Sequence, residues 1–351
     1  MRSGLRQLFE RACDIRRVRA VAYDGDGRDP ELWRALADAG WTAIGIAEAD
    51  GGAGLRFEDV LLVIEEAGRA LAPVPLTTTL LAARAVARAP ESAPRSALLS
   101  RIARGEVSVT LALRDVDRDE AGTATRDGDG WRFDARFSLV PYGPPAGLVL
   151  IEAGRGLIIL PAEAPGMSWT DLNTIDRTVP QYELSLNDVR VNENDSLYAN
   201  ADARDAIAAL RDEWRAALAA ETLGACERLL ELSVAYAKER VQFGRPIGAN
   251  QAVKARIADM GAAVERMRAA VYHAAVKIDA DAEDRAVAVA MAKLATGAAG
   301  AFVGSQAIHV HGGVGYTWEH DVHLYFKRIK SNELLLGDEP VHLARVAEAV
   351  L

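Results

Sequence analysis

The chain has 351 residues and a formal net charge of −9; half of its residues are hydrophobic and 26% are charged. This is the balance of a soluble globular protein long enough for two or three domains, and the lack of a basic stripe argues against nucleic acid as a partner. Its two cysteines, Cys13 and Cys226, form neither a metal-binding spacing nor a disulfide framework, which is typical of the reducing cytoplasm. Because no run of about 18 apolar residues occurs, no membrane span is expected.

Residues 1–106 carry the spacing of amphipathic helices. After Glu58, apolar residues recur every three or four positions, which places them on one helical face, and Pro73 then ends the helix. The apolar positions of this face are Val60, Val63, Ile64, Ala67 and Leu71. The run Asp-Gly-Gly-Ala-Gly at 50–54 is a flexible turn; it could cradle a phosphate, but the plain-loop interpretation is favoured because no P-loop lysine follows.

Between residues 107 and 197 the pattern changes from helical to strand-like. Apolar and polar residues alternate with a period of two, and Gly and Asp separate the runs. Several short strands at this spacing predict a small barrel or sandwich. The predicted strands include Val107 to Leu113, Trp131 with Phe133 and Ala135, Leu148 to Ile151, Leu157 to Leu160, and Tyr182 with Leu184 and Leu186, and the predicted turns are 127–130 and 154–156.

From residue 198 onward the helical periodicity returns. Apolar residues recur at steps of three and four between Leu218 and Tyr236, a second helix starts at about Ala252, and a third runs from about Arg285 to Val310. The third helix is rich in small residues, which permit close packing against other helices. The order helical, β, helical, with a long C-terminal bundle, therefore follows from the pattern.

Four stretches of the chain together resemble the acyl-CoA dehydrogenase family. They follow the family's order and separation and cover nearly the whole chain, and the last two are the most specific. The stretches are 32–41 (Leu-Trp-Arg-Ala-Leu-Ala-Asp-Ala-Gly-Trp) with 51–54 and 65–71 (Glu-Glu-Ala-Gly-Arg-Ala-Leu), 187–191 (Asn-Asp-Val-Arg-Val), 239–247 (Glu-Arg-Val-Gln-Phe-Gly-Arg-Pro-Ile) with Gln251 and 258–260, and 311–320 (His-Gly-Gly-Val-Gly-Tyr-Thr-Trp-Glu-His).

The resemblance implies an α+β multidomain chain with the acyl-CoA dehydrogenase fold: an N-terminal helical domain at 1–106, a middle β-barrel domain at 107–197 and a C-terminal four-helix bundle domain at 198–351. Members of the family are usually tetrameric and hold FAD between domains. They oxidise an acyl-CoA to the 2,3-enoyl-CoA, with a Glu carboxylate taking the α-proton while the β-hydrogen leaves as hydride to the flavin. This chemistry needs a base and a desolvated site that orients the acyl chain between base and flavin.

The resemblance also implies a set of FAD-binding residues. The family's Arg-x-x-Phe-Gly segment reaches across a dimer interface to the neighbour's FAD pyrophosphate, a task that suits arginine because its planar fork binds phosphate oxygens in pairs. A glycine turn lets the backbone approach the adenosine half of the same cofactor. The alternatives are an ordinary solvated arginine and glycines that merely end a helix. The matching residues are Arg240, Gln242, Phe243, Gly312, Gly313 and Gly315, and also His309, which stands where the family usually has glutamine.

Both positions that carry the catalytic base in the family depart from it. The commonest position, just before a glycine, is Leu336, and the alternative position, directly before an arginine, is Trp214. Neither side chain can accept a proton, so no catalytic residue is assigned. Arg215 matches an arginine near the family's active site and is a candidate substrate contact. Substitute bases stay open among the nearby carboxylates, each of which also suits a solvated or salt-bridged role; they are Asp338, Glu339, Glu213 and Glu221.

The flavin-facing segments of the β domain depart from the family as well. Members carry Thr-Glu-Pro and then Gly-Ser-Asp in the first segment, whereas the matching segment here, residues 113–122, is shorter and highly charged. In the second segment, members carry an aromatic residue, Ile and a hydroxyl residue, whereas residues 138–141 here read Ser-Leu-Val-Pro. The chain's own isoalloxazine site is therefore expected to be eroded, while the contacts it donates to the cofactor tail are intact. This asymmetry resembles the smaller, base-lacking subunit of actinobacterial heteromeric acyl-CoA dehydrogenases, which act on bulky steroid-type CoA thioesters.

The sequence thus predicts a cytoplasmic flavoprotein oxidoreductase of fatty acid or steroid catabolism. It would act on an acyl-CoA within a heterotetramer, completing the FAD site of a paralogous subunit that carries the base. No metal site is predicted. Three alternatives stay open, because a fold alone does not decide function. They are a self-sufficient acyl-CoA dehydrogenase with a relocated carboxylate base, a non-catalytic scaffold that binds acyl-CoA or only its partner, and a flavin monooxygenase on the same fold.

Overall fold

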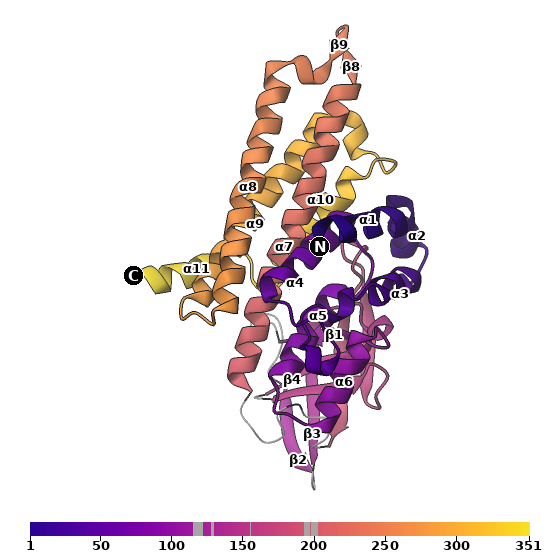
Figure 1. Ribbon diagram of the computed structural model, residues 1–351, viewed down its shortest axis with the longest axis vertical. Coiled ribbons are helices and arrows are strands. Elements are labelled where there is room, and N and C mark those ends of the chain that lie inside the picture. The colour runs from indigo at the N-terminus through magenta and orange to yellow at the C-terminus, as the bar shows by residue number, and fades with distance from the viewer. Residues whose placement is uncertain (115–121, 128–129, 155, 193–196, 198–202) are drawn as a thin grey trace. The chain divides into compact units, whose positions relative to one another are not determined.

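A computed structural model describes residues 1–114, 122–127, 130–154, 156–192, 197 and 203–351 (Figure 1). The chain divides into two compact units. The bundle unit comprises Met1–Ile15, Leu61–Ala72 and Arg215–Leu351, and the sheet unit comprises Arg16–Val60 and Pro73–Trp214. These units do not follow the three predicted domains, and residue 198, at one predicted boundary, lies outside the described residues. The domain boundaries therefore stay a prediction.

Helix α3 of the sheet unit begins with a clear capping signal. Asp29 caps α3 by accepting the backbone N–H groups of Glu31 and Leu32 at 3.0 Å, and Pro30 fills the first turn, where its missing N–H is no loss. Helix α5 buries side chains around most of its circumference and contacts strand β1 and α6. These elements are α2 (Ile15–Tyr23), α3 (Pro30–Asp38), η1 (Trp41–Ala43), η2 (Glu48–Asp50), α5 (Leu76–Arg88), α6 (Ala93–Ala103) and β1 (Ser108–Ala112).

Two sheets contribute to one apolar core of the sheet unit. One has the order β1-β4-β5, with β1 and β4 parallel, and the other is antiparallel with the order β2-β3-β7-β6. Inward side chains from both, such as Phe137, Ile151 and Leu184, are buried together. Residues 128, 129 and 155 of the two predicted turns lie outside the described residues. The further strands are β2 (Thr123–Asp127), β3 (Gly130–Pro141), β4 (Gly147–Ala153), β5 (Gly156–Pro161), β6 (Met167–Leu172) and β7 (Gln181–Val191), with η3 (Pro144–Ala146) after β3.

Long helices form the bundle unit, and glycine sets how closely two of them approach. A Cβ added at Gly224 of α7 would lie 1.9 Å from the carbonyl oxygen of Glu65 on α4, so a side chain does not fit at this crossing. The predicted second and third helices correspond to α8 and α9. The elements are α1 (Arg2–Ala12), α4 (Phe57–Ala70), α7 (Arg204–Glu239), η5 (Ile247–Ala249), α8 (Gln251–Asp279), α9 (Arg285–His311), η6 (Gly312–Tyr316), α10 (Val322–Leu334) and α11 (Glu339–Val350).

Helix α9 is the most apolar helix of the bundle and packs against α8, α10 and α11. Within the described residues, one helical segment, Arg285–Tyr316, has the length and composition that a membrane crossing requires, and 44% of its apolar window is buried. Val289 and Val303 on this helix have no exposed surface. Packing inside the bundle therefore accounts for the buried part of the apolar surface of α9.

Candidate functional site

A short hairpin follows α7 and carries three of the predicted cofactor contacts. Its strands, β8 (Val241–Gln242) and β9 (Arg245–Pro246), are joined by Phe243 and Gly244, whose φ angles are 54° and 77°. Two consecutive residues with positive φ are the mark of a tight type I′ hairpin turn. The backbone N–H of Ile247 closes the base of the hairpin on the carbonyl of Arg240 at 2.8 Å.

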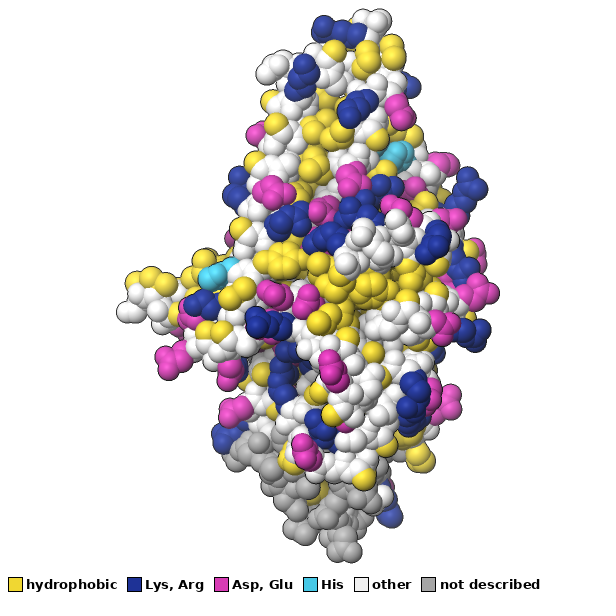
Figure 2. All heavy atoms as spheres, viewed as in Figure 1, with side chains coloured by type: hydrophobic (Ala, Val, Ile, Leu, Met, Phe, Trp, Pro, Cys, Tyr) yellow, Lys and Arg dark blue, Asp and Glu magenta, His cyan; other side chains and the backbone are white. Residues whose placement is uncertain are grey.

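The hairpin exposes the side chains that the sequence singled out. The ring of Phe243 is 97% exposed, although a bulky residue in the left-handed region is strained. Arg240 and Gln242 lie beside it, also exposed. Figure 2 shows dark blue and yellow side chains side by side at the tip of the bundle, where Figure 1 labels β8 and β9. A strained and bare aromatic ring is expected where a molecule outside the chain covers it.

The second predicted contact region is the turn that ends α9. Gly312 has a φ of 64°, and no heavy atom lies within 4 Å of a Cβ built on Gly312 or Gly313, so the backbone of both residues is open to a ligand. Gly315 is different: a Cβ there would meet the carbonyl of Ile308 at 2.9 Å, which anchors the turn on the end of α9. His309, which lies near the end of α9 just before the glycine turn, is exposed.

A stack of three rings lies beneath these two regions, and sequence reasoning missed it. The ring centroid of His311 lies 4.5 Å from that of Tyr236 on α7 and 4.5 Å from that of His320. The signal that could have found it is the density of histidines at 309–323, where the family resemblance assigned a role to His309 and the glycines but none to His311 or His320.

Leu336 and Arg215, from the two regions where the family places its base, meet in the bundle unit. The guanidinium Nε of Arg215 donates to the carbonyl oxygen of Leu336 at 3.1 Å. The backbone of Leu336 lies in the left-handed region, with a φ of 59°. Trp214, at the alternative base position, is 4% exposed. Neither Leu336 nor Trp214 carries a group that can take a proton.

Buried donors hold the backbone of the loop around Leu336. The Nζ of Lys293 donates to the carbonyls of Asn332 at 2.5 Å and Leu335 at 3.0 Å, which caps the end of α10. Burial, followed by the charge of Arg215, lowers the pKa of Lys293 to about 7. We call this arrangement, Lys293 and Arg215 with His342, the loop clamp.

His342 completes the loop clamp as a neutral donor. Its Nε2 lies 3.0 Å from the carbonyl oxygen of Gly337, which can only accept, so Nε2 carries the proton. Burial, followed by the charges of Lys293 and Arg215, lowers the pKa of His342 to about 3. The imidazole is therefore neutral at pH 7, and its Nδ1 is buried with no hydrogen-bond partner among the described residues.

The substitute carboxylates fall into two groups. Glu213 is fully buried and held by Arg84, whose Nε donates to it at 2.7 Å, and by Arg88. Ion-paired in this way, Glu213 is poorly suited to take a proton from a substrate carbon. Asp338 and Glu339 are exposed at the N-terminus of α11, two and three residues beyond Leu336, and the Asp338 side chain makes no capping hydrogen bond.

The fourth carboxylate, Glu221, is buried among polar partners of α10. Its Oε2 accepts from the Nδ2 of Asn332 at 3.2 Å and lies 3.6 Å from an Nη of Arg328. The predicted flavin-facing segments are only partly described: Ser138–Pro141 lies in β3, whereas residues 115–121 lie outside the described residues.

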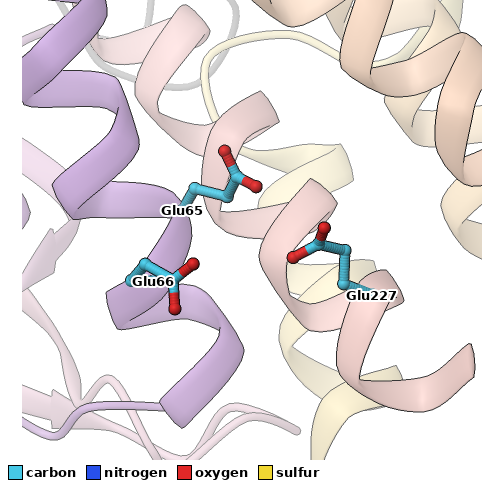
Figure 3. Close-up of side chains that lie close together, drawn as sticks. All are labelled: Glu65, Glu66 and Glu227. Carbon is cyan, nitrogen blue, oxygen red and sulfur yellow. The ribbon is translucent and has the colours of Figure 1, made fainter. Parts of the chain in front are cut away.

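A separate group of acidic side chains has the spacing of a metal site but the contacts of an ion-pair network. The carboxylates of Glu65, Glu66 and Glu227 point toward one another, with oxygens within 4.8 Å (Figure 3). Burial raises the pKa of Glu65, but hydrogen bonds from Arg2 and Tyr272 outweigh it and leave that pKa below its ordinary value. The network also includes Arg6, Arg69 and Arg268. Arginines already neutralise these oxygens, so the group needs no metal ion.

Comparison with known proteins connects this architecture to one family. Residues 1–106 match the acyl-CoA dehydrogenase N-terminal domain and residues 204–351 match the C-terminal domain. The chain is 32% identical to the acyl-CoA dehydrogenase IpdE2 of Mycolicibacterium smegmatis, over all of this chain and 97% of the relative. It is 34% identical to the Mycobacterium tuberculosis IpdE2, over 95% and 91% of the two chains.

Solved structures agree with the sequence relatives. The chain superimposes with a TM-score of 0.92 on a chain of the ChsE4-ChsE5 complex from Mycobacterium tuberculosis, at 30% identity and covering 99% of this chain and 95% of that one. It matches the Tcur3481-Tcur3483 steroid ACAD with a TM-score of 0.90, 34% identity and coverage of 99% and 96%. The predicted family and fold are confirmed, and with them FAD as the cofactor of the family. The chain belongs to the acyl-CoA dehydrogenase family.

Proposed function

We propose that this chain is a subunit of a heteromeric, FAD-dependent acyl-CoA dehydrogenase and that a paralogous partner subunit supplies the catalytic base. The observation that carries the proposal is Phe243, which stands bare on a strained hairpin. It is paired with the expectation from the family resemblance that Leu336, which cannot accept a proton, stands where members carry the base. The reaction is oxidation of an acyl-CoA thioester to the 2,3-enoyl-CoA. Within the assembly, this chain would provide contacts to the cofactor tail and not the proton acceptor.

The exposed residues fit the nucleotide end of FAD. Arg240 offers a planar guanidinium for pyrophosphate oxygens, and Phe243 offers an uncovered apolar ring beside it. Gly312 and Gly313 leave their backbone open to a close approach. Bound FAD supplies the acceptor for the hydride, and the residues of this chain bind and orient its tail. We call these residues the cofactor-tail surface: Arg240, Gln242, Phe243, His309, Gly312 and Gly313.

A bulky CoA thioester in the cytoplasm is the proposed substrate. The solved relatives include a steroid ACAD and a two-component complex, which supports a steroid-type acyl group and a hetero-oligomer. Arg215 stays a proposed substrate-side residue. Its Nε bonds to the carbonyl of Leu336, which places the guanidinium beside that loop. Both cysteines are buried and no disulfide joins them, in keeping with a reducing compartment.

Co-expression with a related chain that carries Glu at one of the two base positions tests the proposal. We expect the two chains to co-purify with bound FAD and to reduce a dye with a steroid-type acyl-CoA, whereas this chain alone does neither. A homotetramer of this chain with one FAD per subunit and dehydrogenase activity would overturn the proposal. An assembly without FAD would favour a scaffold, and oxygen consumption without enoyl-CoA would favour a monooxygenase.

A second candidate is a self-sufficient dehydrogenase with Asp338 as base. Asp338 lies two residues after Leu336, is exposed and makes no side-chain capping bond, so its carboxylate is available to a ligand. If this candidate is right, the isolated chain bleaches bound flavin with an acyl-CoA, and Asp338→Asn abolishes the bleaching. Glu339→Gln is the matched control at the neighbouring exposed position.

A further inference from the structure

We propose that Tyr236, His311 and His320 form a brace that holds the hairpin and the glycine turn in one alignment, with His311 as its positioning residue. This inference rests on the function proposed above, because it concerns how the two halves of the cofactor-tail surface act on one ligand. Each half alone offers few contacts. Two elements that must meet the same molecule bind it well only if their separation is fixed.

The three rings contact one another directly. His311 lies 4.5 Å from Tyr236 with an interplanar angle of 30°, and 4.5 Å from His320 at 59°. Tyr236 and His320 meet edge to face at 6.5 Å and 87°. These distances are those of favourable aromatic pairs. His311 is the ring in the middle of the brace, because it lies nearest to both of the others, and it is 4% exposed.

Hydrogen bonds fix the orientation of both imidazoles. The Nδ1 of His311 lies 2.7 Å from the carbonyl oxygen of Ala307, which can only accept, so this nitrogen carries the proton. The backbone N–H of Val322 donates to the Nδ1 of His320 at 3.3 Å, so that nitrogen carries none. Each ring is thus tied to a different helix end, His311 to that of α9 and His320 to that of α10.

Each end of the brace connects to one half of the cofactor-tail surface. The backbone N–H of Arg240 bonds to the carbonyl of Tyr236 at 2.8 Å, so Tyr236 lies one helical turn below the hairpin. His311 is the last residue of α9, directly before Gly312, and its Cβ would lie 3.1 Å from a Cβ on Gly315. A rotation of the hairpin relative to the turn would therefore separate these rings.

Pulsed electron paramagnetic resonance on the full-length chain measures this alignment without a partner. Spin labels are attached at Val241→Cys and Tyr316→Cys, both of which are exposed, while the native cysteines are buried. We expect one narrow distance distribution that broadens or shifts in His311→Ala and stays narrow in His311→Phe, which keeps a ring. The matched control is His323→Ala, which removes a ring stacked 5.0 Å from Trp318 in the same segment but outside the brace.

A second variant and a second readout keep the outcomes separate. Tyr236→Ala removes a half-buried ring and broadens the distribution even if His311→Ala fails to fold; an unchanged distribution in the folded variants overturns the brace. In the FAD-containing assembly, His311→Ala weakens FAD retention by about tenfold, the size of one aromatic pair, and His311→Phe restores it. If Arg240→Ala leaves FAD retention unchanged, the proposed function fails, whereas the resonance experiment still judges the brace by itself.

Discussion

The hairpin at 240–246 and the loop at 335–337 both lie in the bundle unit, and both contain a bulky residue with positive φ, yet they are built in opposite ways. Phe243 is 97% exposed, and the side chains of its hairpin bond to the hairpin backbone or to the Asn250 side chain just after it. Leu336 lies in a loop whose carbonyls are held by buried side chains of α7, α9 and α11. Buried donors therefore hold the loop, whereas the hairpin leaves its ring accessible.

The hairpin presents an exposed ring that a neighbouring molecule can bind, whereas the loop around Leu336 belongs to a site that the chain would use itself. Positive φ at an exposed aromatic is useful only if the ring is presented to another molecule. The loop clamp preserves the backbone of the base loop although Leu336 cannot accept a proton. This is the arrangement expected if the loop keeps a structural role after losing its chemical one, so substitutions in one region should leave the other intact.

Removing the central donor of the loop clamp should have the largest effect. Lys293→Met leaves the carbonyls of Asn332 and Leu335 buried without their donor, so we expect the free energy of unfolding to fall by about 4 kcal/mol. Urea denaturation at pH 7 measures the change. Lys254→Met, at an exposed position on α8, is the control and should be nearly neutral. Equal stability of the two variants would show that the clamp contributes nothing.

Acid should weaken the loop clamp through His342. Burial and the charges of Lys293 and Arg215 lower the pKa of folded His342 to about 3, whereas an unfolded histidine titrates near 6.5. The folded chain therefore binds this proton less readily, and the stability is complete above about pH 6.5 and lost as the pH falls toward 3. We expect a loss of roughly 3 kcal/mol between pH 7 and pH 4 from this residue.

The control for the acid prediction is a side chain that donates without titrating. His342→Gln can still offer an N–H to the carbonyl of Gly337, and it should remove most of that pH dependence. Carboxylates such as Asp29, whose pKa is raised by burial but lowered further by Arg17, titrate alike in both proteins and cancel in the comparison. Parallel stability curves from pH 7 to pH 4 for the two proteins would contradict the prediction.

Much of the architecture could be read from periodicity, because a helix or strand records its buried face locally. The Ala-rich run expected at 285–310 became α9, Arg285–His311, and the alternation at 182–186 became part of β7. The ion pair between Glu213 and Arg84 joins residues 129 positions apart, and no local pattern marks such a contact. Likewise the Arg-x-x-Phe-Gly motif identified Phe243 but not its left-handed backbone, which depends on the register of the hairpin.

On the hairpin, removing the guanidinium should affect binding and not folding. Arg240→Ala is expected to weaken FAD retention in the assembled dehydrogenase by about thirtyfold, close to 2 kcal/mol, the scale of an arginine that is covered on binding. The stability of the Arg240→Ala chain in urea should equal that of the native chain within experimental error, because Arg240 is exposed. Arg266→Ala, at an exposed position on α8, is the matched control. FAD retention that is equal in both variants would remove the hairpin from the cofactor site.

The smallest effect distinguishes the two strained residues from each other. Asparagine tolerates the left-handed region and favours the type I′ turn when glycine follows, so Phe243→Asn should raise the free energy of unfolding by about 1 kcal/mol. The same variant removes the exposed ring and should weaken FAD retention. Leu336→Asn relieves similar backbone strain in the loop, yet it should leave FAD retention unchanged. If Phe243→Asn is more stable and retains FAD as well as the native chain, the strain at the hairpin tip has no role in cofactor binding.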